Sequence, residues 1–255
     1  MEQVFADYDA SLVALAIAAA MLIAWRAGLL MGLRLRRKTG EARTSNFDDA
    51  SLALISLLLA FTFSMSIGKH DQRRLMVIAD SNAIGDFYTC ASLLKEPVRT
   101  KLHTVIRDYA ELRLRIVGTR PDSAEFERAL QRTRFMQAQM TEVVGEALEQ
   151  GTPIAVSLTN ALNGVTSNHA ARLAAATDRL LVSIVALLLL SAVVATMLVG
   201  REQGASDKSE IAGTLCFIVL VTFAIYVTLD LNQPTRGLIT VRQESMRQLL
   251  AAMSK

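Results

Sequence analysis

A run of eighteen residues without a charge, Ala50–Ile67, constrains this chain more than any other feature of its sequence. Two aspartates precede the run and Lys69 follows it. Eighteen residues of α-helix are about long enough to cross a hydrocarbon core of roughly 30 Å. The helical pattern continues to Gly85, and the first proline of the chain is Pro97. The sequence therefore predicts a membrane-spanning helix that continues beyond the membrane as the first helix of a second domain.

Three further runs are long enough to span a membrane: Leu12–Leu33, Leu180–Val199 and Ile211–Leu229. Only 20% of the residues are charged and 52% are hydrophobic, with a mean hydropathy of +0.33. Soluble domains are typically richer in charge, at about 25%. The predicted fold is an all-α membrane protein, in which four transmembrane helices form two pairs and an extramembrane helical bundle is inserted between spans 2 and 3.

The insert carries apolar residues at helical spacing and no segment of alternating apolar and polar residues. Proline and glycine divide it into helices. We expect a first helix to end near Leu94, a second to run from Pro97 to Gly118, a third from Pro121 to Gly151, and a fourth from Pro153 unbroken into the third span.

The predicted parts of the chain are residues 1–67 (first transmembrane pair with a short basic loop), 68–178 (extramembrane helical domain), 179–231 (second transmembrane pair) and 232–255 (amphipathic tail). The tail is too short and too charged to span a membrane. It is expected either to lie in the membrane interface or to pack on the helical bundle.

Positive charge predicts the orientation of the chain in the membrane. No Lys or Arg precedes the first span, whereas the first loop has five, Arg34, Arg36, Arg37, Lys38 and Arg43. Short basic loops tend to stay in the cytoplasm. We therefore expect this loop to be cytoplasmic and the insert to lie outside the cytoplasm.

The sequence contains no recognisable enzyme motif. The histidines His70, His103 and His169 lie on different predicted helices, and no P-loop, nucleophile elbow or dinucleotide fingerprint occurs. The basic residues are dispersed, without the clusters typical of nucleic-acid binding. We predict that the protein is not an enzyme, has no metal or cofactor, and does not bind nucleic acid.

Three consecutive motifs resemble the bacterial bestrophin-like family of membrane proteins. They are the apolar Leu59–Met65, the basic Lys69–Arg74, and the Asp-x-Asn-Ala-Ile-Gly segment from Asp80 to Gly85. The resemblance implies a multi-pass protein of the bacterial inner membrane. It also implies kinship with bestrophins, pentameric anion channels with a helical domain between the second and third of four spans, whose second span lines the pore.

Carried over to this chain, the resemblance makes span 2 the candidate pore helix. The pore-lining candidates are Leu57, Phe61, Phe63, Ser64 and Met65. The alternative is that the two phenylalanines pack against spans 3 and 4. The hydroxyls of span 2 either line a wet path or bond to carbonyls of their own helix.

Two further groups of candidates follow span 2. Lys69, Arg73 and Arg74 either attract anions to a vestibule or contact lipid headgroups. Asp80, Asn82 and Gly85 form a predicted helix-packing motif, with a ligand-binding role as the alternative.

Two functions remain open from the sequence. The first is a homo-oligomeric channel for ions, gated by a hydrophobic constriction at Phe61 and Phe63. The resemblance implies that the homo-oligomer is a pentamer. The second is a membrane-anchored sensor or scaffold whose helical domain binds a partner or ligand. Both require the lipid bilayer as a partner.

Overall fold

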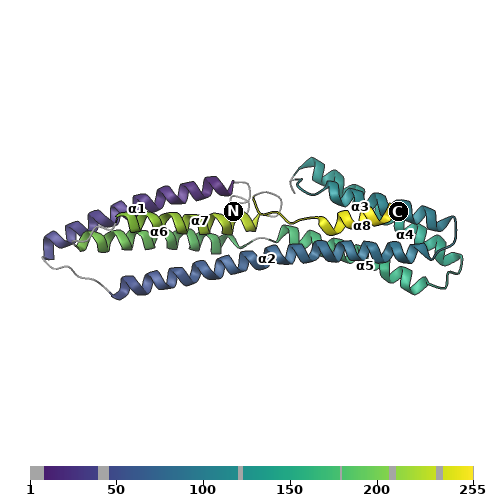
Figure 1. Cartoon of the computed structure of the whole chain (residues 1–255), viewed down its shortest axis with the longest axis horizontal. Helices are drawn as coiled ribbons and strands as arrows, with labels where there is room; N and C mark the ends of the chain where they lie inside the picture. The colour runs from purple at the N-terminus through teal and green to yellow at the C-terminus, as the bar shows by residue number, and fades with distance from the viewer. Residues whose placement is uncertain are drawn as a thin grey trace. The chain divides into compact units, whose positions relative to one another are not determined.

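The computed structural model describes residues 9–39, 46–119, 123–178, 180–206, 211–233 and 238–254, the side chains of 38–39 and 46–52 excepted. Over these residues the chain is helical and contains no strand, which confirms the all-α prediction (Figure 1). The helices are α1 (Ala10–Thr39), α2 (Asn46–Ser92), α3 (Val98–Arg115), α4 (Ala124–Glu149), α5 (Ala155–Thr177), α6 (Val182–Ala205), α7 (Ile211–Asn232) and α8 (Glu244–Met253).

The chain divides into two compact units, and α2 contributes to both. The membrane unit contains residues 1–69, 179–233 and 237–239, and the helical unit contains 70–178, 234–236 and 240–255. Helix α8 therefore belongs to the helical unit, and its Met246 and Met253 are buried in that unit's core. Of the two predicted locations of the tail, packing on the bundle is the one observed.

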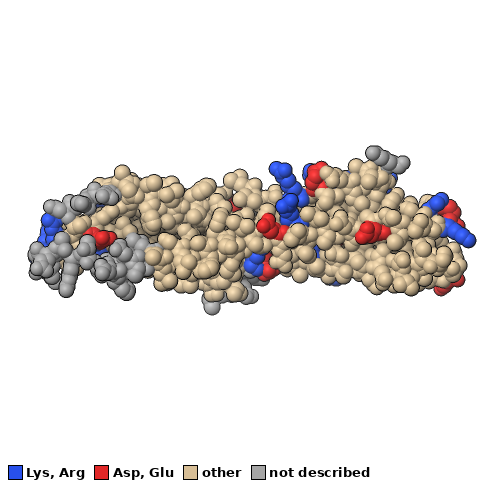
Figure 2. Space-filling view, turned by 60° about the horizontal axis from the view of Figure 1, so that its bottom comes forward, with Lys and Arg blue, Asp and Glu red and all other residues tan. Residues whose placement is uncertain are grey.

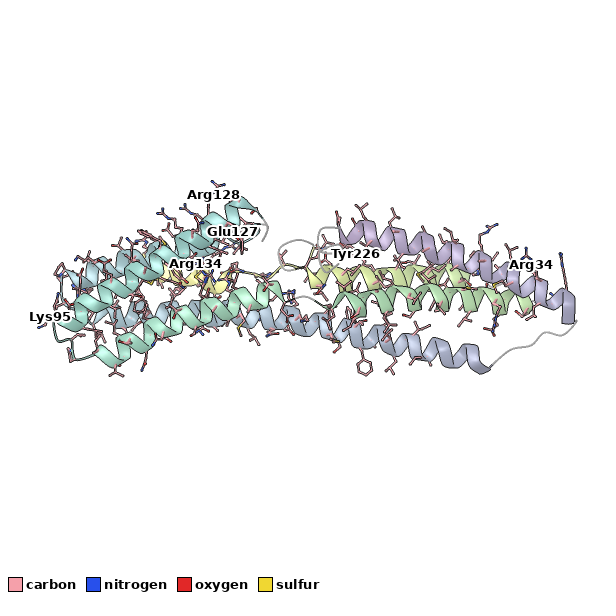
Figure 3. All side chains as sticks on the ribbon, turned by 180° about the vertical axis from the view of Figure 1, so that it is seen from behind. Arg34, Lys95, Glu127, Arg128, Arg134 and Tyr226 are labelled. Carbon is pink, nitrogen blue, oxygen red and sulfur yellow. The ribbon has the colours of Figure 1, made fainter. Side chains whose placement is uncertain are left out.

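The membrane unit supplies four helices that are long and apolar enough to cross a bilayer. They are α1, the first part of α2, α6 and α7, as the four apolar runs predict. Figure 3 shows Arg34 and Tyr226 at opposite ends of this unit. Many of its large apolar side chains are exposed, and part of the molecular surface shows no Lys, Arg, Asp or Glu (Figure 2). This exposure is expected where hydrocarbon is the solvent.

Close glycine contacts join α1 and α6. Gly28 and Gly32 of α1, four residues apart, approach the backbone of Met197 and Arg201, and Gly200 and Gly204 of α6 approach Trp25 and Leu29. A Cβ atom on any of the four glycines would collide with a backbone carbonyl oxygen of the other helix. Small residues at a spacing of four allow transmembrane helices to pack backbone to backbone, which replaces the hydrophobic effect that is absent in lipid.

The helical unit begins and ends its helices largely where proline, glycine and serine predict. Pro97 is the N-cap of α3, and the Oγ of Ser123 accepts a hydrogen bond of 3.1 Å from the backbone N–H of Phe126 at the start of α4. Gly118 and Gly151 have φ values of +91° and +71°, which residues with a Cβ rarely adopt.

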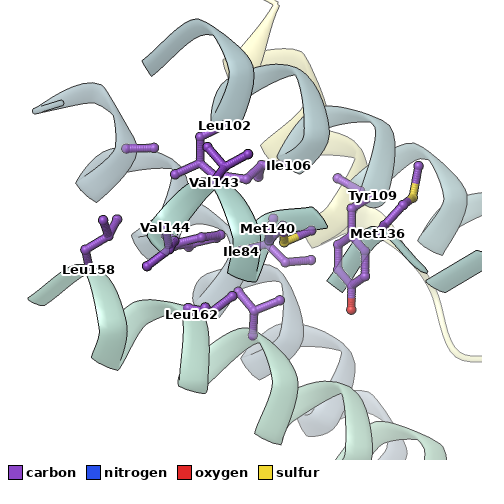
Figure 4. Packing of buried hydrophobic residues seen from close by; sticks show 14 of the residues in the cluster. Ile84, Leu102, Ile106, Tyr109, Met136, Met140, Val143, Val144, Leu158 and Leu162 are labelled. Carbon is purple, nitrogen blue, oxygen red and sulfur yellow. The ribbon is translucent and has the colours of Figure 1, made fainter. Parts of the chain in front are cut away.

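One core unites the helices of this unit (Figure 4). Fully buried members come from α2, α3, α4 and α5, and they include Ile84, Leu102, Ile106, Met140 and Leu158. The interdigitating Leu, Ile, Met and Val side chains make this a well-packed helical core.

The prediction that the fourth insert helix runs unbroken into the third span is wrong. Helix α5 ends at Thr177, Asp178 is extended, and α6 begins at Val182. The guanidinium of Arg73 donates to the carbonyl oxygens of Ala175 at 3.2 Å and Asp178 at 2.7 Å. The last carbonyls of a helix have no partner in their own helix, so a cation at this position stabilises the helix end.

Candidate functional site

The predicted pore residues lie mainly on one exposed stripe of α2. Leu57 and Phe61 are 52% and 61% exposed in the single chain, and Ser64 and Met65 lie on the same face. The stripe follows the spacing of three and four that places side chains on one side of a helix. Thr62 and Ser66, on the opposite side, are buried, so this part of α2 has one packed face and one open face.

Phe63 and the hydroxyls occupy different positions around this helix. Phe63 is less exposed than Phe61, because residues two apart point in nearly opposite directions from a helix. The Oγ1 of Thr62 donates to the carbonyl oxygens of Leu58 and Leu59, both at 3.0 Å. Of the two uses predicted for the hydroxyls, Thr62 shows the bond to its own helix.

The three basic candidates after span 2 have different surroundings. Lys69 is half-buried and Arg74 is exposed. Arg73 is buried, and its guanidinium is held by the carbonyls at the end of α5.

The helix-packing candidates also differ from one another in burial. Asp80 is fully buried, and a Cβ on the half-buried Gly85 would meet Leu249 of α8 at 3.2 Å. Asn82 is exposed in the single chain. The buried face of α2 in the helical unit is the line Arg73, Val77, Asp80, Ser81, Ile84, Phe87 and Ala91.

Asp80 is the centre of a buried ionic cluster. Its Oδ2 accepts hydrogen bonds from Arg113 of α3, at 3.0 Å from Nη2 and 3.3 Å from Nε, and from Arg172 Nη1 of α5 at 2.7 Å. The Nη2 of Arg172 donates to the side-chain oxygen of Gln243, just before α8, at 2.8 Å. One carboxylate thus joins three helices directly, and Arg172 extends the connection to α8.

Burial is the main cause of pKa shifts in three groups at this cluster. Burial, and then the positive charge of Arg113, lower the pKa of the Arg172 guanidinium. Burial raises the pKa of Tyr109 to about 12. Burial, and then Arg113, lower the pKa of His169 to about 4, so this imidazole is neutral at pH 7.

Sequence analysis missed Arg113 and Arg172, although a signal for each exists. Arg113 continues the buried line Leu102, Ile106 and Tyr109 of α3, and Arg172 follows the buried His169 by three positions on α5. A charged residue in register with an apolar stripe indicates a buried ion pair. Its partner lies far away in the sequence, so only the tertiary structure identifies Asp80.

A cavity of about 630 Å³ lies beside the ionic cluster, within the helical unit. Five arginines line it: Arg73, Arg113, Arg172, Arg242 and Arg247. Among the described residues that line it, the only carboxylate is that of Glu244. Within the described part of the chain, no group of three or more His, Cys, Asp or Glu residues is placed to hold a metal ion.

Four apolar spans in two pairs, with a helical unit inserted between the pairs, define a polytopic α-helical membrane protein. The chain belongs to the Bestrophin-like domain family, whose model matches residues 14–246. This match confirms the resemblance that the motifs of α2 predict.

Solved structures of bacterial bestrophin homologues share this fold. A Klebsiella pneumoniae bestrophin homologue with a leucine-to-threonine substitution matches with a TM-score of 0.69 at 14% identity, over 93% of this chain and 98% of that chain. A tyrosine-to-alanine variant matches with a TM-score of 0.66 at 13% identity, over 92% of this chain and 99% of that chain. None of the curated proteins matches the sequence significantly. At these identities the likeness concerns the fold.

Proposed function

We propose that this protein is the subunit of a homo-oligomeric ion channel whose pore is lined by the exposed stripe of α2. Membership of the Bestrophin-like domain family and the fold shared with bacterial bestrophin homologues support this function. The family resemblance also makes a pentamer and anion conduction the first arrangement to test.

The observation that carries the proposal is how little of the α2 span is covered within the subunit. In the most apolar stretch of 18 residues of this span, only 11% is buried, against 22–28% in the corresponding stretches of the other three spans. The open stripe combines Leu57, Phe61 and Met65 with the hydroxyl-bearing Ser64. Large apolar side chains beside a hydroxyl suit a narrow hydrophobic constriction, which controls conduction by wetting and dewetting.

Lys69 and Arg74 belong to the same proposal. Both follow the apolar part of α2, Lys69 half-buried and Arg74 exposed. They would attract anions to a vestibule or contact lipid headgroups. Asp80 and Gly85 would hold the helical unit together, while the exposed Asn82 is available to a second subunit.

Ion flux through liposomes tests the channel, with a matched pair of phenylalanine variants. Phe61 of α2 and Phe223 of α7 are 61% and 63% exposed within the subunit, so both accept alanine without opening a cavity in the core. If Phe61 forms the constriction, Phe61→Ala will raise chloride or potassium flux at least threefold, whereas Phe223→Ala will leave it unchanged.

Two results would contradict the proposal. Absence of flux from both the native protein and Phe61→Ala, in liposomes that contain folded protein, rules out a channel. Flux that responds equally to Phe61→Ala and Phe223→Ala places the pore elsewhere.

Co-purification from native membranes distinguishes the sensor or scaffold alternative. A scaffold requires a partner protein that recovers with this chain in a fixed ratio. Recovery of a homo-oligomer alone, with its mass measured in nanodiscs, supports the channel and counts its subunits.

A further inference from the structure

The arginine-lined cavity of the helical unit has a composition that ion conduction does not explain. Its walls come from α2, α3 and the residues that follow it, α4, α5, the segment before α8, and the start of α8. All of its lining residues belong to the helical unit. A volume of about 630 Å³ suits a small organic molecule, since ligand pockets typically measure about 300–1,000 Å³.

Positive charge exceeds negative charge at this cavity. Among the described residues, two carboxylates face the five lining guanidinium groups: Glu244 at the wall, and Asp80 behind it, bound to Arg113 and Arg172. Arginines remain charged at physiological pH, and a guanidinium matches the geometry of a carboxylate. The excess positive charge therefore favours an anion in the cavity.

Three of the arginines are fixed in place before any ligand arrives. Arg113 and Arg172 are hydrogen-bonded to Asp80, and Arg73 is hydrogen-bonded to the carbonyls of Ala175 and Asp178. Binding to groups that are already ordered costs less conformational entropy than ordering free side chains.

Apolar side chains make up much of the rest of the wall, beside the polar Thr119, Thr177, Thr240 and Gln243. Hydrocarbon is presented by Val77, Ile116, Val117, Phe126, Leu130 and Leu173. A small inorganic ion would leave this surface in contact with water, whereas a molecule with a hydrocarbon body would cover it.

We propose that this cavity binds an organic anion with an apolar body, a carboxylate or a phosphate ester, its anionic head held by the arginines and its body by the apolar wall. The inference concerns the helical unit and does not depend on whether the protein conducts ions. Such a ligand has two possible sources, a soluble organic anion and an anionic lipid, and the experiment below distinguishes them.

Fluorine NMR on the full-length protein in phosphatidylcholine nanodiscs provides the test, with three probes. 4-(Trifluoromethyl)benzoate carries both an anionic head and an apolar body, the corresponding benzyl alcohol carries the body alone, and trifluoroacetate is the anion with little apolar surface. We expect saturable binding of the benzoate, at least tenfold tighter than that of either partial probe. Equal binding of the alcohol, or no saturable binding of the benzoate, overturns the proposal.

Variants locate the bound probe. Arg242 and Arg247 line the cavity and are exposed, so Arg242→Gln/Arg247→Gln leaves the buried cluster intact. We expect at least a tenfold loss of benzoate affinity, and no loss in Arg128→Gln, an exposed arginine of α4 that is not part of the cavity wall (Figure 3). Unchanged affinity in the double variant refutes the site.

A second pair of variants tests the apolar wall by charge repulsion. Val117 lines the cavity and is 44% exposed, whereas Val156 is exposed elsewhere on the helical unit. Val117→Glu should weaken benzoate binding at least tenfold and Val156→Glu should not. Equal effects of the two variants refute the site. Competition by phosphatidylglycerol in the nanodisc supports the proposal with a lipid as the source, and undiminished binding supports it with a soluble organic anion.

Discussion

Asp80 joins three helices of the helical unit through one carboxylate oxygen. It is fully buried on α2, and its Oδ2 receives hydrogen bonds from arginines on α3 and α5. A buried carboxylate between two buried guanidinium groups is weak evidence of net stabilisation, because desolvation offsets the attraction. Removal of the carboxylate charge alone is different, because it leaves two buried cations with no anion.

Asp80→Asn is therefore expected to destabilise the helical unit strongly. Removing one partner of a buried pair costs about 3–5 kcal/mol, and in a protein of this size that lowers Tm by on the order of 10 °C. Thermal unfolding followed by circular dichroism measures the effect. Asp86→Asn, an exposed aspartate on the same helix, is the matched control and should leave Tm within about 2 °C of the native value. Equal Tm values for the two variants would show that the ionic cluster is not needed for the fold.

His169 makes the stability of the helical unit depend on pH. The charged groups that act on it are Arg113, Asp80, Arg172 and Arg134, from four different helices. Burial and the nearby arginines lower its pKa from 6.5 to about 4, so the unfolded chain binds the proton more readily than the folded chain. The contribution of neutral His169 to the unfolding free energy is therefore complete above pH 6.5. It is lost as the pH falls from 6.5 toward 4.

Between pH 6.5 and 4 this histidine should cost up to about 3 kcal/mol of unfolding free energy. His169→Leu removes the titrating group and fills a similar volume. Tm measured against pH should run parallel for the two proteins above pH 6.5 and diverge below it, with the native protein losing more stability. Parallel curves down to pH 4 would contradict the lowered pKa.

At the scale of the helix, α1 and α6 are joined by four glycines. Gly28 and Gly32 meet α6, and Gly200 and Gly204 meet α1, each within collision distance of any added Cβ. The nearest atoms are backbone atoms, so a side chain at these positions must push the two helices apart.

Gly200→Leu should destabilise the membrane unit by on the order of 3 kcal/mol. A side chain added between two rigid backbones can be accommodated only if the helices move apart. Gly68→Leu is the matched control, since a Cβ at Gly68 meets nothing within 4 Å. Unfolding in detergent with increasing sodium dodecyl sulfate compares the two variants. A loss of stability in Gly68→Leu as large as in Gly200→Leu would rule out the close α1–α6 contact as the cause.

Helix α2 combines two environments in one element of 47 residues. Its first part has an open stripe at Phe61 and Met65 and a packed face at Thr62 and Ser66. Its second part buries Asp80 and Phe87 in the helical unit. One helix thus carries the proposed pore face and the central residue of the ionic cluster.

For the whole molecule, the side of the membrane on which the helical unit lies is still a prediction. The basic first loop, with Arg34, Arg36 and Arg37 at the end of α1, predicts that the unit lies outside the cytoplasm. Bestrophins, which the sequence resembles, have this domain in the cytoplasm, so the orientation decides how far the family analogy extends.

Reporter fusions decide the orientation. Gly118 is a suitable position in the helical unit, because a Cβ there meets nothing within 4 Å. A fusion after Ser206, at the end of α6, probes the opposite side without disturbing the packed Gly204. Alkaline phosphatase should be active at Gly118 and inactive after Ser206. The reverse pattern would show that the helical unit is cytoplasmic and that the basic residues of the first loop do not predict the orientation.

The sequence by itself determined the four spans, the all-helical class, most helix ends of the insert and the family. The family follows from the motifs of α2. The other three follow from local physics, since a long apolar run favours burial in lipid and proline or glycine interrupts a helix. It did not determine the break after Thr177, where no proline or glycine stands. That end is stabilised by Arg73, a residue about a hundred positions earlier.

Only the tertiary structure decided which polar residues meet. Asp80, Arg113, Arg172 and Gln243 lie on separate elements, and the rotation of each helix determines which side chains face one another. The same holds for the glycines of α1 and α6, whose contact depends on the register between two helices. Such pairings arise from packing of distant segments, so local sequence patterns can indicate a buried position but cannot name its partner.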